Sequence, residues 1–240
     1  MRRIGVLGGM GPQATVLFQQ RLIDAVPAAD DSDHVPLVVD MNPQVPSRIA
    51  HLIDGTGEDP GPVLAAMALR LAEAGADALA MPCNTAHHYA ESIRAATPLP
   101  FIDMVALSSA QAHEAAPGGA PIGILGSPAL RRAGVFDPVL AGLGREAAYP
   151  VDEDALLAAI RDVKAGRDPA AARATLARAA AALAENGAGA VLVACTEFSL
   201  HADAAIGPAP LIDTLDVLVE ATLDFARHGR LEGPAKRTAA

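Results

Sequence analysis

The sequence predicts an α/β fold of two similar halves with mostly parallel sheets, related by a pseudo-twofold axis and facing each other across a cleft. Three observations predict this fold. Short apolar runs of strand length alternate with Ala- and Leu-rich segments of helical period, which is typical of βα units. Runs such as Val191-Leu192-Val193 are apolar at every position, as in strands that are buried on both faces. The third observation is an internal repeat.

Most of the predicted strands are short apolar runs that are followed by a candidate helix; strand 146–148 is followed by two helices, and strand 190–194 is followed by the last strand. In chain order the strands span residues 4–7, 35–40, 78–82, 101–103, 121–125, 146–148, 190–194 and 211–213. The helices span residues 12–25, 60–74, 85–96, 104–115, 131–143, 153–165, 169–186 and 215–228. This regular alternation predicts crossover connections between parallel strands.

The repeat consists of three matches that occur in the same order. Ile-Gly-Val-Leu-Gly at 4–8 returns as Ile-Gly-Ile-Leu-Gly at 122–126, and Pro-Phe-Ile-Asp at 100–103 returns as Pro-Leu-Ile-Asp at 210–213. Between them, Gly-Ala-Asp-Ala-Leu-Ala-Met-Pro-Cys at 75–83 is matched by Gly-Ala-Gly-Ala-Val-Leu-Val-Ala-Cys at 187–195. We therefore expect one half from residues 1–103 with 214–228, a second half from 104–213, and a disordered tail at 229–240.

Composition narrows the classes of function. The formal net charge of the 240-residue chain is -10 and its Lys and Arg are scattered, so a nucleic-acid partner is not expected. No apolar run approaches 18 residues, so no membrane span is expected, and the N-terminal apolar run is too short for a signal peptide. We expect a cytoplasmic protein that acts on a small molecule.

The chain has two cysteines, Cys83 and Cys195, and each follows the carboxyl end of a predicted strand in one half. Ligands of open α/β sheets bind outside those strand ends. Neither cysteine has a CxxC or HxxxH neighbour, which argues against a zinc site. Two facing halves would therefore place one thiol on each side of a cleft. The alternative is that both are inert buried thiols, because Cys often behaves as a small hydrophobic residue.

Two facing thiols suit the inversion of a stereocentre that carries hydrogen. One thiolate removes the proton from one face, and the opposite thiol returns a proton to the other face. Asn84-Thr85 and Thr196-Glu197 follow the cysteines where helices are expected to begin. A helix N-terminus lowers a thiol pKa, and its amides can hold an α-carboxylate as charge builds on it.

The same segments resemble a known family. Met-Pro-Cys-Asn-Thr-Ala-His at 81–87, Ala-Cys-Thr-Glu at 194–197 and Leu-Gly-Gly-Met-Gly-Pro-Gln-Ala-Thr at 7–15 resemble the aspartate/glutamate racemases, and most of all their aspartate racemase branch. The resemblance runs from about residue 1 to about residue 228. It implies two similar α/β halves with the active site between them, no pyridoxal phosphate or metal cofactor, and a homodimer.

The resemblance also implies roles for individual residues. Cys83 and Cys195 would be the paired acid and base, while Asn84, Thr85 and Thr196 would contact the α-carboxylate of the substrate.

Three further residues are implied to form the rest of the pocket. Met10 would line it, and Arg48 and Lys164 would hold the distal carboxylate of aspartate or glutamate. The sequence departs from the family at Ser127-Pro-Ala129 and Phe136, where many members have Thr-x-x-Thr and a Tyr. Ser127 is still expected to line the pocket.

Other readings remain open. Gly9 to Ala14 matches the dinucleotide fingerprint GxGxxA, which suggests a NAD-binding oxidoreductase, but Asp40 lies later than the usual spacing of about 20 residues. A non-catalytic amino-acid sensor, a hydantoin racemase and a maleate isomerase are further alternatives. We expect Glu197 to cap or orient the second loop rather than act as an acid, and we expect one of His87 and His88 to be exposed on a helix first turn.

Overall fold

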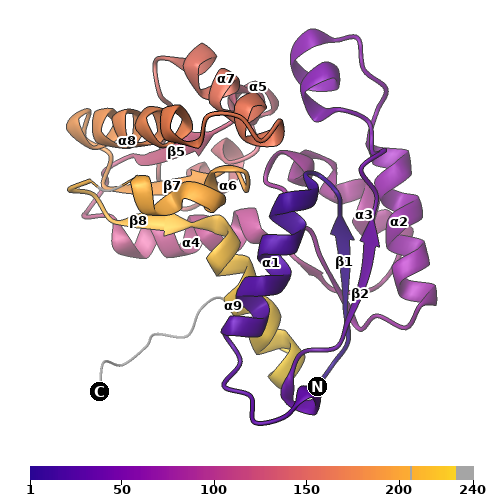
Figure 1. Ribbon diagram of the computed structural model, residues 1–240. Coiled ribbons are helices and arrows are strands. Elements are labelled where there is room, and N and C mark those ends of the chain that lie inside the picture. The colour runs from indigo at the N-terminus through magenta and orange to yellow at the C-terminus, as the bar shows by residue number, and fades with distance from the viewer. Residues whose placement is uncertain (206, 231–240) are drawn as a thin grey trace.

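In the computed structural model, which describes residues 1–205 and 207–230, the chain forms two parallel sheets of four strands each (Figure 1). The first has the order β2-β1-β3-β4 and the second the order β6-β5-β7-β8, which is the same topology. The strands are β1 (Ile4–Gly8), β2 (Leu37–Met41), β3 (Ala78–Ala80), β4 (Phe101–Ile102), β5 (Ile122–Gly126), β6 (Ala147–Ala148), β7 (Ala190–Ala194) and β8 (Leu211–Asp213). The predicted α/β class is confirmed.

Helices cover both faces of each sheet. The α-helices are α1 (Pro12–Asp24), α2 (Gly61–Glu73), α3 (Ala90–Ala96), α4 (Met104–Ala115), α5 (Pro128–Ala133), α6 (Asp137–Gly142), α7 (Glu153–Lys164), α8 (Pro169–Glu185) and α9 (Thr214–His228). Shorter helical turns are η1 (Asp31–Asp33), η2 (Ala50–Asp54), η3 (Thr85–Tyr89) and η4 (Phe198–Ala204). No helix within these described ranges combines the length and the apolarity that crossing a membrane requires.

The two halves share one hydrophobic core. It joins side chains of both sheets, such as Ile4 and Ile124, to residues of α1, α4 and α9. Two further cores lie on the outer faces, one beneath α2 and α3 and the other beneath α7 and α8. Because the inner core is continuous, the halves form one packed body, and their strand ends meet at fixed positions.

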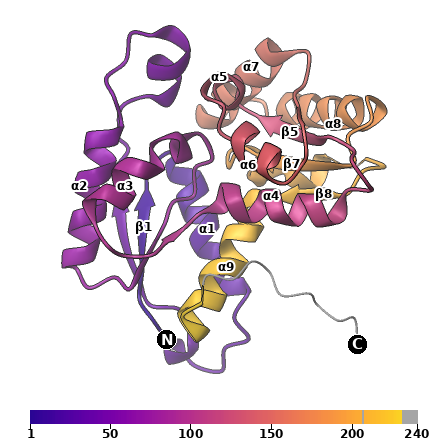
Figure 2. The ribbon, with the colours of Figure 1, turned by 180° about the vertical axis from the view of Figure 1, so that it is seen from behind.

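Helix α9 links the end of the second half to the first. It leaves β8 and runs alongside α1, as both views show (Figures 1 and 2). At its far end the Arg2 amide donates to the Ala226 carbonyl over 2.9 Å, and at its start Arg21 of α1 contacts Asp213 at 2.6 Å and Asp216 at 2.8 Å. The last helix therefore fastens the two halves together.

Two predicted helices are wrong in detail. The segment 131–143 is not one helix but parts of α5 and α6, because α5 starts at the Ser127 cap and ends at Gly134, whose φ of 60° is left-handed. The segment 85–96 starts as the 3-10 turn η3 and becomes α-helical only at Ala90. The predicted disordered tail lies almost entirely outside the described residues, which end at Arg230.

Candidate active site

A pocket of about 40 Å³ lies where strands of both sheets end. Among its lining residues are four that lie within three residues of a strand end: Met10 after β1, Cys83 after β3, Ser127 after β5 and Cys195 after β7. The other lining residues are Ser47, Arg48, Ile49, Thr85, Ile160, Lys164 and Glu197. The pocket thus lies outside the carboxyl ends of both sheets, where ligands of parallel sheets bind.

A larger cavity of about 200 Å³ lies between α7 and α8, but neither cysteine lines it. We place the candidate site at the smaller pocket because thiols, cations and a carboxylate converge there. Perturbed titratable groups in a concave site are a better guide to chemistry than volume.

Cys195 is a buried thiol held by a carboxylate. Its Sγ donates to Oε2 of Glu197 over 3.1 Å, and Oε1 of the same carboxylate lies 3.4 Å from Nζ of Lys164. Burial, and then the negative charge of Glu197, hold the pKa of the Cys195 thiol well above its usual range, while Lys164 opposes this in part. The thiol is therefore protonated at neutral pH.

Two sequence expectations are wrong at this point. A helix N-terminus was expected to lower the thiol pKa, but the turn after Cys195 is a short 3-10 helix, and burial beside Glu197 outweighs it. Glu197 was expected to cap or orient that loop, and the capping part is wrong because its side chain makes no cap hydrogen bond. It contacts Cys195 and Lys164 instead.

The two cationic residues come from equivalent parts of the two halves. Arg48 lies in the segment after β2, and Lys164 is the last residue of α7, which follows β6. Nη1 of Arg48 donates to the carbonyls of Val45 and Pro46, at 3.3 and 3.0 Å, and these contacts hold the guanidinium beside the pocket. Each of the two cations is thus supplied by the second βα unit of its half.

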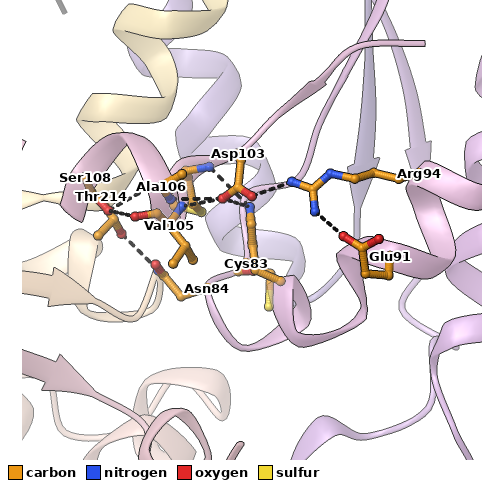
Figure 3. A network of polar contacts seen from close by, with 11 residues as sticks. Cys83, Asn84, Glu91, Arg94, Asp103, Val105, Ala106, Ser108 and Thr214 are labelled. Carbon is orange, nitrogen blue, oxygen red and sulfur yellow. Dashed lines mark hydrogen bonds and ion pairs between the residues drawn. The ribbon is translucent and has the colours of Figure 1, made fainter. Parts of the chain in front are cut away.

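Asn84 and Thr196 do not line the pocket but tie the two cysteine loops together. The Asn84 side-chain amide donates to the Thr214 hydroxyl over 2.9 Å, and that hydroxyl donates to the Val193 carbonyl over 2.9 Å (Figure 3). In the other direction, the Thr196 hydroxyl donates to the carbonyl of Pro82 over 3.2 Å. The second loop is therefore tied directly to the first loop, and the first loop is tied to β7 through Thr214 at the start of α9.

The hydrogen bond to Thr214 leaves Oδ1 of Asn84 without a partner. This atom is buried, and within residues 1–205 and 207–230 no donor reaches it. The amide orientation is fixed because the Thr214 hydroxyl already gives its proton to Val193 and must accept from Asn84. An unpaired buried acceptor is costly, so a group that donates to Oδ1 would bind favourably.

In the glycine loop after β1, the amide of Gly9 is hydrogen-bonded within the protein. The Gly9 amide donates to the Thr15 hydroxyl over 3.0 Å, and that hydroxyl donates to the Gly11 carbonyl over 3.1 Å. Gly9 has φ 94°, and a Cβ there would lie 2.4 Å from the Asn42 backbone. The loop thus packs against the segment after β2 instead of leaving its amide free for a pyrophosphate.

Ser127 occupies the corresponding place after β5. Its hydroxyl accepts from the Ala129 amide over 3.2 Å and caps α5 while the residue lines the pocket. Phe136, the other departure from the family pattern, is fully buried in the shared core. Phe136 therefore contributes to the core and does not line the pocket.

Sequence reasoning missed four of the lining residues or misjudged them. Ser47 and Ile49 flank Arg48, and Ile160 precedes Lys164 by one helical turn, so each could have been found as a neighbour of a named cation. Glu197 was named, but only as a residue that orients its loop. Its contact with the thiol depends on side-chain direction, which the sequence does not give.

Comparison with known proteins agrees with this geometry. A family model described as Asp/Glu/hydantoin racemase matches residues 7–222. The broad-specificity amino-acid racemase RacX of Bacillus subtilis is 26% identical over 228 residues, which cover 92% of this chain and 96% of RacX.

Solved structures show the same fold. An aspartate racemase of Picrophilus torridus superposes with a TM-score of 0.83 at 28% identity and covers 95% of each chain. A glutamate racemase of Bacillus anthracis gives a TM-score of 0.64 at 15% identity, with 97% of this chain and 84% of that chain covered. At that identity the second likeness concerns the fold alone.

Proposed function

Because this chain belongs to the Asp/Glu/hydantoin racemase family, whose members are isomerases, we propose that it interconverts L- and D-aspartate by moving protons through Cys83 and Cys195. The observation that supports this most is the pocket itself. Two thiols, one after β3 of the first sheet and one after β7 of the second, line the same small space. A stereocentre held between them would have a sulfur available on each face.

The proposed reaction proceeds through two proton transfers. The Cys83 thiolate removes the α-proton, so that the Cα–H bond breaks, an S–H bond forms, and the electron pair passes to the α-carboxylate as an enolate. Cys195, which is held as a thiol, then gives its proton to the opposite face of Cα and becomes a thiolate. The opposite enantiomer reacts by the reverse sequence.

Glu197 suits the exchange of the Cys195 proton. Its Oε2 accepts the thiol hydrogen at 3.1 Å, and Lys164 lies beside its other oxygen. A proton that leaves Cys195 therefore has an acceptor at hydrogen-bond distance. This arrangement lets Cys195 act as a base toward the enantiomer that presents its hydrogen to that sulfur.

Two of the remaining polar residues would bind the substrate backbone. We propose that Thr85 and Ser127, which line the pocket, contact the α-carboxylate, where fixed donors stabilise the charge that builds during deprotonation. Asn84 and Thr196, which the family resemblance also assigned to the α-carboxylate, would instead hold the loops that carry the two cysteines. Met10 would pack against the carbon chain.

The choice of aspartate depends on charge. Arg48 and Lys164 are two cations in a pocket that holds one carboxylate, Glu197, so a second carboxylate balances them. The Picrophilus torridus relative is named an aspartate racemase, while RacX is named for broad specificity. Glutamate, one methylene longer, is the nearest competing substrate.

The nucleotide-binding alternative is disfavoured by the contacts of the glycine loop. The Gly9 amide, which would face a pyrophosphate in a dinucleotide site, donates to Thr15 instead.

Solvent exchange tests the proposed activity. The protein is incubated with L-aspartate or L-glutamate in D₂O without added cofactor, and proton NMR follows the α-hydrogen. We expect loss of the α-hydrogen of aspartate, accompanied by D-aspartate, at a higher rate than for glutamate. A lack of exchange with either amino acid, or exchange only after NAD is added, would contradict the proposal.

We propose a homodimer because of the family resemblance, and light scattering coupled to size exclusion measures it. A cytoplasmic location is likewise proposed.

A further inference from the structure

The backbone carbonyl of Cys83 is held by a buried imidazole. Nδ1 of His87 lies 2.9 Å from this carbonyl oxygen, and Nε2 lies 3.3 Å from the amide nitrogen of Met104. The His87 side chain is 2% exposed. A residue one turn after Cys83 therefore connects the cysteine loop to the first residue of α4.

The two contacts fix the tautomer of His87. The Met104 amide is a donor, so Nε2 must accept and carries no proton. The Cys83 carbonyl is an acceptor, so Nδ1 must carry the proton and donate. The imidazole is consequently neutral, and both of its nitrogens are used by the backbone.

Asp103 and Arg94 fix the far side of this contact. Asp103 caps α4 by accepting from the amides of Val105 and Ala106, each at 3.0 Å, and Arg94 donates to its other oxygen over 2.6 Å (Figure 3). The carboxylate lies 3.9 Å from Nε2 of His87, beyond hydrogen-bond distance. The network holds the N-terminus of α4 rigidly against the imidazole.

In the second half, the carbonyl of the cysteine is held by backbone amides instead of a side chain. The carbonyl of Cys195 accepts from the backbone amides of Phe198 and Ser199, at 2.8 and 3.2 Å. Ser199 stands four residues after Cys195, as His87 does after Cys83, and its hydroxyl donates to Asp213, the cap of α9, over 2.7 Å. The carbonyl of Cys195 thus relies on backbone, whereas that of Cys83 relies on a side chain.

We propose that His87 is a positioning residue for Cys83, holding the loop so that the thiol faces the pocket, while Cys195 needs no such side chain. This inference rests on the proposed two-thiol function. His87 does not touch the substrate. It acts through the backbone carbonyl of Cys83. The position of this backbone determines where the Cys83 side chain and its thiol point.

The structure suggests matched variants. His87→Leu removes both contacts of the imidazole. His87→Gln has one donor and one acceptor on its side-chain amide and can retain both contacts, whereas the shorter His87→Asn can reach one partner at most. Ser199→Ala removes a hydroxyl from the equivalent position but leaves the backbone amides on Cys195. His88→Gln, at the exposed neighbour, is the control.

The test measures each cysteine separately. Iodoacetamide alkylates both thiols in one sample, and mass spectrometry of the two peptides gives their separate rates. Because a freed loop exposes a buried thiol, we expect Cys83 in His87→Leu to react about threefold to tenfold faster, with Cys195 unchanged within about twofold. The turnover number kcat for aspartate should fall about tenfold with little change in KM, and His87→Gln should lie nearer the parent protein.

Faster alkylation together with slower turnover distinguishes lost positioning from lost reactivity. If His87→Leu does not fold, the alkylation rate of Cys83 is compared between His87→Asn and His87→Gln, and the Asn variant is expected to react faster. Unchanged Cys83 alkylation in the Leu or Asn variant would overturn the inference. So would equal acceleration of both cysteines, or a Ser199→Ala effect on Cys195 as large as that of His87→Leu on Cys83. Alkylation needs no substrate, so this result stands apart from failure of the proposed racemisation.

Discussion

At the scale of single residues, Glu197 has the most consequential position in the site. One of its oxygens accepts from Cys195 and the other lies beside Lys164, so it links the buried thiol to the cation. A Cβ on Gly11 would lie 3.3 Å from the same carboxylate, which shows how closely the glycine loop approaches it. Burial raises the pKa of Cys195 most, and this local charge arrangement adds to the effect, so substitutions at Glu197 can change it.

Glu197→Gln tests that arrangement. Removing the carboxylate charge removes one cause of the raised pKa of Cys195, while burial remains. We expect the thiolate of Cys195 to form at lower pH than in the parent protein, measured by pH-dependent alkylation of its peptide. Glu185→Gln, at an exposed helix end, should have no effect. A Cys195 thiolate that forms at the same or a higher pH in Glu197→Gln would be inconsistent with the arrangement.

The two cations test the substrate assignment. Arg48→Ala and Lys164→Ala should each reduce kcat/KM for aspartate by about one to two decades, since a charge-assisted contact contributes about 1.5–3 kcal/mol. Arg178→Ala, at an exposed position on α8, should leave aspartate kinetics unchanged. Aspartate kinetics that remain as in the parent protein in both cation variants would show that the distal carboxylate binds elsewhere.

At the scale of elements, the strands and the cysteine loops could be predicted from the sequence and its internal repeat, but contacts that depend on side-chain direction could not. Strand 190–194 was found because its apolar run is complete, and strand 211–213 repeats the pattern of 101–103. The cysteines were placed by the strand ends that precede them. The helix expected at 131–143 failed because Gly134 interrupts it after one short helix.

The site showed the same limit. The strand ends predicted which loops meet, but not that Asn84 contacts Thr214 at the start of α9 or that Thr196 contacts the carbonyl of Pro82 in the first cysteine loop. Asn84 and Thr196 are polar and could form hydrogen bonds with a substrate or with the protein. Only the packed structure shows which group each side chain contacts.

The buried imidazole at the start of α4 predicts a dependence of stability on pH. Burial lowers the pKa of His87, although the nearby Asp103 opposes this and Arg94 adds to it. As pH falls below about 6.5, His87 therefore takes up a proton in the unfolded chain but stays neutral in the folded protein. Stability is lost from there down to the folded-state pKa, because the unfolded state binds more protons in that window.

Urea unfolding at pH 7 and pH 5 measures this loss. The decrease in the free energy of unfolding should be larger in the parent protein than in His87→Gln, which lacks the titrating group. His88→Gln, at an exposed position, should keep the full decrease. An equal decrease in the parent protein and His87→Gln would show that His87 is not responsible.

At the scale of the whole molecule, the fold presents two equivalent strand ends to one pocket. The halves share a sheet order, a core and the helix α9, which crosses from the second half to α1 of the first. Arg21 adds a fixed link, since it contacts Asp213 and the Ser199 carbonyl, each at 2.6 Å, close to the Cys195 loop. A rigid junction of this kind is what two acid–base groups on opposite faces of one carbon require.

The most direct test of this two-faced site uses single cysteine variants with both enantiomers of aspartate in D₂O. Chiral chromatography measures inversion, proton NMR measures exchange at Cα, and circular dichroism confirms that each variant folds. We predict that Cys83→Ala and Cys195→Ala each abolish inversion, because the carbanion can no longer be protonated from the face opposite the remaining thiol. Each variant should still exchange deuterium into one enantiomer, and the two variants should favour opposite enantiomers. Sustained inversion by either variant would contradict the two-thiol mechanism.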